Sequence, residues 1–201
     1  MAGRATLISV SLVFLVSVCP VEAATPAVSI SSGGVSSDRD NNGWRFQALS
    51  DIEVVSLGAW DEGEDGFPMS VAVGLWTDGG VLLDMVTLPA GTGATLDNGF
   101  RYGALNNPVA LDAGQFYRVA STPTSGDLEF RVDVSLVSAQ EIGFDSGYFS
   151  TTDNVLTFPD QQSPFPAVPD FFGANFQYVP EPSSSFFLLI GALGFFMRRC
   201  P

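Results

Sequence analysis

The sequence has no histidine and no lysine, and its only two cysteines, Cys19 and Cys200, lie near the ends of the 201-residue chain. The lack of histidine excludes Ser-His-Asp and Cys-His catalytic pairs and zinc sites with histidine ligands. The lack of lysine excludes a P-loop and a Schiff-base lysine. The chemistry of many hydrolases and nucleotide-binding proteins is therefore missing from this chain.

Positive charge is scarce. All eight basic residues are arginines, against 22 Asp and Glu, and the formal net charge is −14 at pH 7. Nucleic-acid binders depend on cationic side chains that contact phosphates, so nucleic acid is not expected as a partner. Hydrophobic residues make up 46% of the chain and include 17 Phe, which is the composition of a folded protein rather than a disordered one.

Residues 1–23 have the parts of a secretory signal peptide. Arg4 and the free amine form a short positive region, and residues 7–18 are apolar apart from serines. This apolar stretch is too short to cross a bilayer core of about 30 Å as a helix. We predict cleavage after Ala23 or Ala24, with an uncleaved N-terminal anchor as the alternative.

The C-terminus has a proline cluster, an apolar segment and a basic end. These are Val179-Pro180-Glu181-Pro182, residues 183–197 and Arg198-Arg199. Residues 183–197 would span about 22 Å as a helix, at about 1.5 Å per residue, which is short for a stable membrane span. Arginines that stay on the cytoplasmic side agree with the positive-inside rule. The segment fits a sorting signal that is later removed, and a plain C-terminal membrane anchor is the alternative.

These parts, in this order, resemble the PEP-CTERM sorting signal of exported proteins in Gram-negative bacteria. The resemblance implies export by the secretion translocon and processing near Pro180-Glu181-Pro182 by an exosortase-type membrane transpeptidase. It also implies a cell-surface or extracellular location, after transient anchoring in the inner membrane, in a bacterium that makes extracellular polysaccharide. This copy departs from the pattern because its apolar part is short and rich in Phe, and because Cys200-Pro201 follows the arginines.

Four regions follow from these two ends: a signal peptide (1–23), a linker (24–42), one domain (43–179) and the sorting signal (180–201). The body between the two signals has 20 acidic residues, five arginines and no cysteine. It must therefore be stabilised by packing alone in an oxidising compartment. Its length is sufficient for one hydrophobic core.

The body is predicted to be all-β, an antiparallel β-sandwich of jelly-roll or immunoglobulin-like type. An N-terminal signal helix and a C-terminal hydrophobic helix are expected to flank it. Apolar and polar residues alternate in 128–136 and 172–178, which is typical of half-buried strands. The apolar phase slips near Val54-Val55, which predicts a β-bulge. Further strands are expected at 44–49, 71–76, 81–83, 99–105, 115–121 and 142–150.

Turn-forming residues separate these strands. Thr77-Asp78-Gly79-Gly80 predicts a hairpin turn. Other turns are expected at Asn98-Gly99, Asn106-Asn107-Pro108, Asp112-Ala113-Gly114 and Ser125-Gly126-Asp127. Residues 25–37 are read as a linker or a weak first strand, and the proline-rich residues 159–170 as a long irregular loop.

The segments from Gly43-Trp44-Arg45-Phe46 to Leu111-Asp112-Ala113-Gly114 carry a second resemblance. Their order is similar to an uncharacterised β-sandwich domain that is common in PEP-CTERM proteins, and the similarity extends over residues 43–179. It implies an architecture and a cellular setting. It implies no catalytic residues.

Two acidic segments are candidates for calcium. Asp61, Glu62, Glu64 and Asp65 place four carboxylates within six residues, and a divalent cation would relieve their repulsion. The alternative is a solvated acidic loop.

The second segment, Asp38-Arg39-Asp40-Asn41-Asn42-Gly43, begins like an EF-hand loop. The bidentate Glu of that loop is replaced by Leu49. An irregular calcium site completed by Asp51 remains open, and the alternative is an acidic turn before a strand.

Trp60 and Trp76 are candidate ligand-binding residues, since aromatic faces stack on sugar rings. Trp44, Tyr102 and Tyr117 could join them in a platform, and the alternative is that all of these residues pack the core. No motif places two carboxylates as a glycosidase would need.

We therefore expect an exported, non-catalytic protein of the cell surface or extracellular matrix, associated with exopolysaccharide or biofilm and without a resident cofactor, although calcium remains an option. The alternative is a carbohydrate-binding module, with or without stabilising calcium, and a glycosidase comes third. A carbohydrate-binding module predicts at least two exposed, coplanar aromatic rings. A structural protein predicts buried tryptophans.

Overall fold

The computed structural model describes residues 23–36, 40–122, 130–151, 155–164 and 173–181. Within these residues the protein is almost entirely β-structure, and the one helical element is a 3-10 turn, η1 (Glu62–Glu64). The strands are β1 (Thr25–Pro26), β2 (Val28–Ser36), β3 (Asn41–Ala48), β4 (Ile52–Trp60), β5 (Val71–Thr77), β6 (Leu82–Leu88), β7 (Thr95–Asp97), β8 (Phe100–Leu111), β9 (Phe116–Ser121), β10 (Phe130–Ser138), β11 (Ile142–Ser150), β12 (Gln161–Gln162) and β13 (Ala174–Pro180). The all-β prediction is confirmed. The predicted flanking helices are not supported, because both segments lie outside the described residues.

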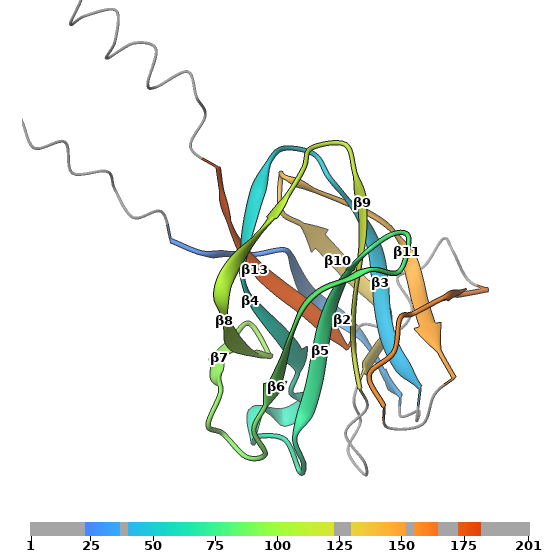
Figure 1. Ribbon diagram of the computed structural model, residues 1–201. Helices are drawn as coiled ribbons and strands as arrows, with labels where there is room; N and C mark the ends of the chain where they lie inside the picture. The colour runs from blue at the N-terminus through green and yellow to red at the C-terminus, as the bar shows by residue number, and fades with distance from the viewer. Residues whose placement is uncertain (1–22, 37–39, 123–129, 152–154, 165–172, 182–201) are drawn as a thin grey trace, which may run out of the picture.

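Two antiparallel sheets form the body, in a sandwich-like arrangement (Figure 1). One has six strands in the order β12-β11-β3-β9-β5-β6, and the other has five in the order β1-β13-β4-β8-β7. Strands β10 and β2 form a separate two-stranded ribbon. Many consecutive strands change sheet, as β3 to β4 and β4 to β5 do, so the hydrophobic faces of the two larger sheets meet in one core.

Aromatic side chains join the two sheets. Trp44 and Phe46 of β3 and Phe176 of β13 are all fully buried. Trp44 stacks on Phe176 with ring centroids 5.9 Å apart, and Phe46 lies 4.8 Å from the same ring. The indole Nε1 of Trp44 donates a hydrogen bond of 2.8 Å to the carbonyl of Ala174, so its polar atom is satisfied inside the core.

The predicted bulge near Val54-Val55 is confirmed, since Ser56 and Val54 pair with the successive residues Gln177 and Tyr178 of β13, which leaves Val55 as the extra residue on β4. On β8, the facing strand, Val54 pairs with Val109 and Ser56 pairs with Ala104. Residues 105–108 are therefore opposite Val55 alone. The turn expected at Asn106-Asn107-Pro108 is wrong, because β8 continues through these residues, which form an irregular bulge in the strand. Proline lacks a backbone donor and is tolerated at such a position.

Most of the predicted strands and turns are found. The Thr77–Gly80 hairpin is confirmed, and Gly80 has the left-handed φ of 87° that favours glycine. The Asn98-Gly99 turn joins β7 to β8.

Three expectations need correction or lie outside the described residues. Of the two readings of residues 25–37, the strand is the one observed, since β1 and β2 are paired there. The boundary at residue 43 is corrected, because β3 already begins at Asn41. The short strand β12 interrupts the loop expected at 159–170. The Ser125-Gly126-Asp127 turn, Leu128 and Phe172 lie outside the described residues.

The two ends of the described domain lie beside each other. Thr25 of β1 pairs with Tyr178 of β13, and Pro180 pairs with Ile52 of β4. The N–H of Glu181 donates a hydrogen bond of 3.2 Å to the carbonyl of Asp51. Ala23 and Ala24 are exposed, so the predicted cleavage point and the start of the predicted sorting motif adjoin one edge of the sheet.

Pro182, Arg198 and Arg199 belong to the residues that the structure does not describe, as do residues 1–22. In the part of the chain that is described, no helix has the length and hydropathy needed to cross a membrane.

Candidate functional site

The acidic loop after β4 is organised around a buried carboxylate. The Asp61 side chain is 2% exposed, and its Oδ2 accepts a hydrogen bond of 2.5 Å from Nε of Arg101, whose side chain is 4% exposed. Both Asp61 oxygens also accept from the N–H of Gly66, at 3.1 Å. The Asp61 carboxylate therefore points into the protein and already accepts hydrogen bonds from Arg101 and Gly66.

Arg101 ties this loop to the segment before β7. Its guanidinium donates to the carbonyls of Glu64, Thr92 and Ala94 at 2.9 to 3.3 Å. The fork of donors in arginine suits such a multiple contact. The local role of Asp61 and Arg101 is to hold the loop against the five-stranded sheet.

The four candidate calcium ligands do not converge. Glu62 accepts a hydrogen bond of 2.8 Å from Nε1 of Trp60, and the side chains of Glu64 and Asp65 are exposed. No group of three or more His, Cys, Asp or Glu that could hold a metal ion is found among the described residues.

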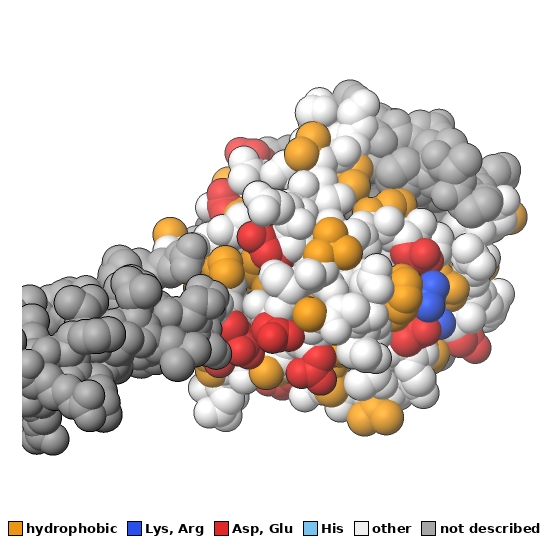
Figure 2. Space-filling model, turned by 90° about the horizontal axis from the view of Figure 1, so that it is seen from above, with side chains coloured by type: hydrophobic (Ala, Val, Ile, Leu, Met, Phe, Trp, Pro, Cys, Tyr) orange, Lys and Arg blue, Asp and Glu red, His pale blue; other side chains and the backbone are white. Residues whose placement is uncertain are grey.

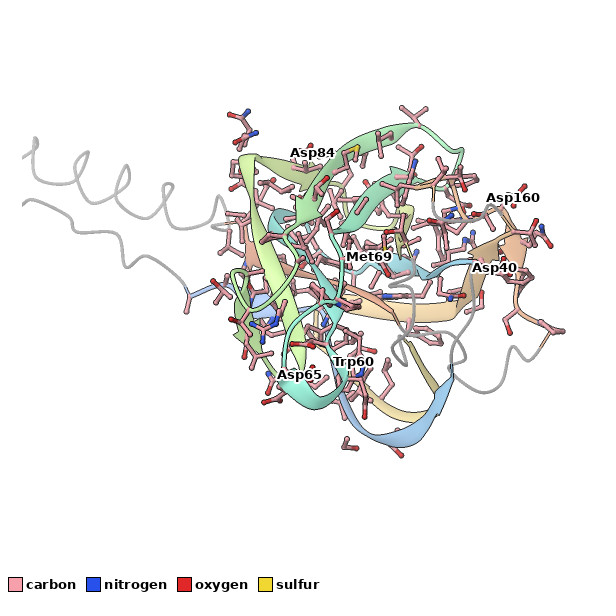
Figure 3. All side chains as sticks on the ribbon, turned by 90° about the horizontal axis from the view of Figure 1, so that it is seen from below. Asp40, Trp60, Asp65, Met69, Asp84 and Asp160 are labelled. Atoms are coloured by element: carbon pink, nitrogen blue, oxygen red, sulfur yellow. The ribbon has the colours of Figure 1, made fainter. Side chains whose placement is uncertain are left out.

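The second calcium candidate is also dispersed. Asn41, Asn42 and Gly43 belong to β3, not to a loop, and both asparagine side chains are buried. Asp51 follows the opposite end of this eight-residue strand, and strands rise about 3.3 Å per residue. A site that combines Asp40 with Asp51 is therefore wrong. Figure 3 also shows Asp40 well apart from Asp65. Asp38 and Arg39 lie outside the described residues.

The tryptophans do not form a common platform. Trp44 is fully buried, and Trp76, Tyr102 and Tyr117 are 4 to 6% exposed. Trp60 is half-buried at the end of β4, where it packs edge-on against Phe100 with ring centroids 5.1 Å apart. Trp60 and Trp76 stand on different sheets, so the predicted pair of coplanar stacking rings is wrong.

A charged network covers part of the outer face of the six-stranded sheet. Arg45 of β3 and Arg118 of β9 are paired neighbours, and both bind Asp78 at 2.8 to 3.0 Å. Arg45 also binds Asp145 at 3.1 Å. Burial disfavours the charged form of Asp78, but the hydrogen bonds from Arg45 and Arg118 outweigh it and hold the pKa of Asp78 below its ordinary value.

Aromatic rings complete this network. The guanidinium of Arg118 lies 4.0 Å from the ring centroid of Tyr148 and 4.6 Å from that of Phe158. Arg45 lies 4.0 Å from the ring centroid of Phe116. Figure 2 shows a small area of arginine side-chain surface set among acidic and hydrophobic side chains. Sequence patterns did not predict this network, although the turn at Asp78 and the outward positions of Arg45 and Arg118 on alternating strands indicated its parts.

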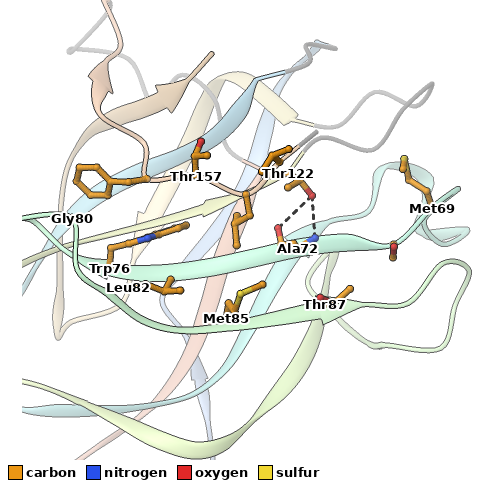
Figure 4. Close-up of a pocket in the computed structure, with 13 residues that line it drawn as sticks. Met69, Ala72, Trp76, Gly80, Leu82, Met85, Thr87, Thr122 and Thr157 are labelled. Carbon is orange, nitrogen blue, oxygen red and sulfur yellow. Dashed lines mark hydrogen bonds between the residues drawn. The ribbon is translucent and has the colours of Figure 1, made fainter. Parts of the chain in front are cut away.

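A groove lies next to the network, between the outer face of β5 and β6 and the segment 155–158 (Figure 4). Its volume is about 730 Å³. None of the described residues that line it is charged. The lining residues are Met69, Ser70, Ala72, Trp76, Gly80, Leu82, Met85, Thr87, Thr122, Val155, Leu156, Thr157 and Phe158.

Hydrogen bonds and ring contacts fix the walls of the groove. Nδ2 of Asn41 donates to the carbonyl of Val155 at 2.7 Å, and a guanidinium nitrogen of Arg118 donates to the carbonyl of Pro159 at 2.7 Å. Phe158 packs edge-on against Trp76 with ring centroids 6.3 Å apart. The described lining of the groove therefore consists of apolar side chains, glycine and hydroxyl groups.

No protein-family model matches this sequence, and no curated protein matches it either.

Proposed function

We propose that this chain is an exported, non-catalytic β-sandwich protein of the cell surface or extracellular matrix, associated with exopolysaccharide. Its ends would be processed by a signal peptidase and by an exosortase-type transpeptidase at the inner membrane of a Gram-negative bacterium. One observation carries the proposal. The described core runs from Ala27 to Tyr178 and packs both large sheets, while the expected cleavage points adjoin the same sheet edge just beyond it.

This arrangement suits a domain that keeps its fold when both ends are removed. The core residues all lie between the two expected cleavage points. Strand β1 begins just after the first point, β13 ends just before the second, and the two strands pair with each other. Removal of residues 1–23 and of the segment after Glu181 would therefore leave every described core contact in place.

We also propose that the sandwich is a jelly roll. A jelly roll of eight strands pairs the first, eighth, third and sixth strands in one sheet and the second, seventh, fourth and fifth in the other. With β1, β3, β4, β5, β6, β8, β9 and β13 as the eight strands, the observed orders β1-β13-β4-β8 and β3-β9-β5-β6 fit this pattern. The strands β10, β11 and β12 are then an insertion before the last strand.

Carbohydrate binding is the second candidate, and the charged network favours it. The Arg45 guanidinium lies over the Phe116 ring and binds Asp145, and the Arg45 and Asp145 side chains are 23% and 35% exposed. Sugar rings are recognised by such a combination of aromatic faces and polar groups. A screen against polysaccharides with Arg45→Ala as the loss-of-contact variant tests it. A glycosidase has the least support, because none of the described residues that line the groove is a carboxylate.

Mass spectrometry of the mature protein from its own host tests the main proposal. We expect an N-terminus that begins at Ala24 or Thr25 and a C-terminus that ends close to Glu181, with or without an attached group. Export of a chain that retains residues 183–201 would overturn the sorting part of the proposal. A chain that retains residues 1–23 in the cytoplasm would overturn the whole proposal.

A matched variant separates sorting from folding. Replacement of Arg198 and Arg199 together by alanine should leave the melting temperature of the purified domain unchanged and prevent C-terminal processing. Normal processing of this variant would contradict a role for the two arginines.

A further inference from the structure

We propose that the groove between β5, β6 and residues 155–158 binds the apolar chain of an uncharged or cationic amphiphile, with the head group in solvent. This site is separate from the export signals, and it adjoins the charged network, whose Arg118 contacts the Phe158 wall. It rests on the composition of the groove, its fixed shape and the charge around it.

The groove concentrates the exposed apolar surface of the protein. Eight large hydrophobic side chains of the described residues are exposed, and four of them line this groove. They are Met69 (37%), Leu82 (45%), Met85 (43%) and Val155 (58%). A grouped apolar surface on a soluble domain marks a binding site, and methionines adapt to the shape of flexible apolar ligands.

The polar atoms of the groove do not suit a sugar. The hydroxyl of Thr122 accepts from the N–H of Ala72 at 3.0 Å, and the Thr157 hydroxyl lies 2.6 Å from that of Ser150. Among the described residues that line the groove there is no Asp, Asn, Glu, Gln or Arg, and these are the planar polar groups that usually hold sugar hydroxyls. A hydrocarbon chain needs no such partners.

The groove is formed before any ligand arrives. The Trp76 ring lies over Gly74, where an added Cβ would come within 2.4 Å of the indole. Phe158 is held from its other side by the Arg118 guanidinium. Because both aromatic walls are fixed, little conformational entropy is lost when a chain binds.

Charge selects the head group. A ligand in an open groove leaves one end in water, and the protein around it carries a net charge of −14. An anionic head group is repelled at low salt, whereas a neutral or cationic one is not. The ligand class is therefore an alkyl or acyl chain with a neutral or positive head.

Four probes of matched structure test this site on the full purified domain. Dodecyl maltoside, dodecyltrimethylammonium and dodecyl sulfate share one chain and differ in head-group charge, and maltose is the neutral head group alone. Each is titrated below its critical micelle concentration at low salt, with calorimetry and tryptophan fluorescence as readouts. We expect binding of dodecyl maltoside and dodecyltrimethylammonium, about tenfold weaker binding of dodecyl sulfate, and none of maltose.

Variants locate the site. Met85→Asp and Leu82→Asp each place a carboxylate in the groove and should weaken dodecyl maltoside by about tenfold or more. Leu49→Asp is the matched control, because Leu49 is 54% exposed, lies outside the groove and gains the same charge. Thermal melts of all three variants show whether they are folded. Trp76→Phe should retain binding by calorimetry and lose most of the fluorescence change.

Three results would overturn the proposal. Maltose that binds as well as dodecyl maltoside would make the groove a sugar site. Equal weakening by Leu49→Asp would place binding elsewhere. A wild-type dimer that Met85→Asp converts to a monomer would make this face an interface between two copies of the chain.

Discussion

Asp61 and Arg101 form a buried ion pair, and two segments far apart in the sequence are joined by it. Both side chains have further partners, since Asp61 accepts from Gly66 and Arg101 donates to three carbonyls. A buried pair of this kind adds little stability compared with apolar packing, but either charge becomes very costly when its partner is lost. The acidic loop thus owes its conformation to one carboxylate rather than to its total charge.

Asp61→Ala should lower the free energy of unfolding by about 3–5 kcal/mol, because Arg101 would remain charged and buried without a partner. Asp65→Ala, in the same loop but exposed, should change it by less than about 0.5 kcal/mol. Chemical denaturation of both variants measures the difference. Equal effects of the two substitutions would show that the loop depends on its total charge instead.

The Asp78 network should make stability depend on pH in the acid range. The folded pKa of Asp78 lies below its ordinary value of 3.8, so its contribution is fully present above about pH 4 and is lost as the pH falls through the folded pKa. Asp78→Asn should therefore melt at a lower temperature than the wild type at pH 7. The gap should close below about pH 3.8, where the wild-type carboxylate becomes protonated in the unfolded chain and then in the folded one. A gap that stays constant from pH 7 to pH 2 would contradict this.

Two glycines provide a matched test of backbone packing. A Cβ at Gly43 would lie 2.0 Å from the carbonyl oxygen of Val119 and 2.6 Å from the Cβ of Ala120 on the neighbouring strand. A Cβ at Gly79 would have no neighbour closer than 3.9 Å. Gly43→Ala should cost about 1–3 kcal/mol or more, whereas Gly79→Ala should be nearly neutral. Urea unfolding compares them, and similar midpoints would place β3 and β9 farther apart than the structure does.

Two buried tyrosines should resist ionisation. Burial raises the pKa of Tyr102, with a smaller effect from Asp97, and burial together with the hydrogen bond to Glu141 raises the pKa of Tyr178. Because the folded pKa is raised, the free energy of unfolding is unaffected below the unfolded pKa of about 10 and falls as the pH rises above it. Tyrosinate absorbance should therefore appear in two stages, the second together with unfolding. Tyr178→Phe should make the alkaline loss of stability less steep.

Short-range patterns predicted much of the fold. Alternation located β13 and the inward residues of β5, and the change of phase near Val54-Val55 located the bulge. Asn98-Gly99 predicted a turn, and both residues have the positive φ of a two-residue hairpin. The short strand β7 before it was missed, because three residues carry too little periodicity.

Long-range pairing explains the failures. Residues 25–37 are rich in Ser and Gly and have little strand propensity, yet β1 and β2 are held by β13 and β10 from the other end of the chain. Asn106-Asn107-Pro108 has the composition of a turn, but the strands on either side both pair with β4. The acidic segment after β4 is a similar case. Its sequence indicated a cluster of carboxylates, but Asp61 instead pairs with Arg101 of a distant strand. Contacts between distant strands decide which carboxylates meet.

The adjacency of β1 and β13 has a practical consequence for engineering. Because Thr25 faces Tyr178, a few glycines would join the two ends of the folded unit without strain. New termini opened in the hairpin between β5 and β6 would then give a circularly permuted domain with the same core. Such a rearranged chain would present its free ends at the opposite edge of the molecule, which is a convenient format for surface immobilisation or for fusion to a reporter.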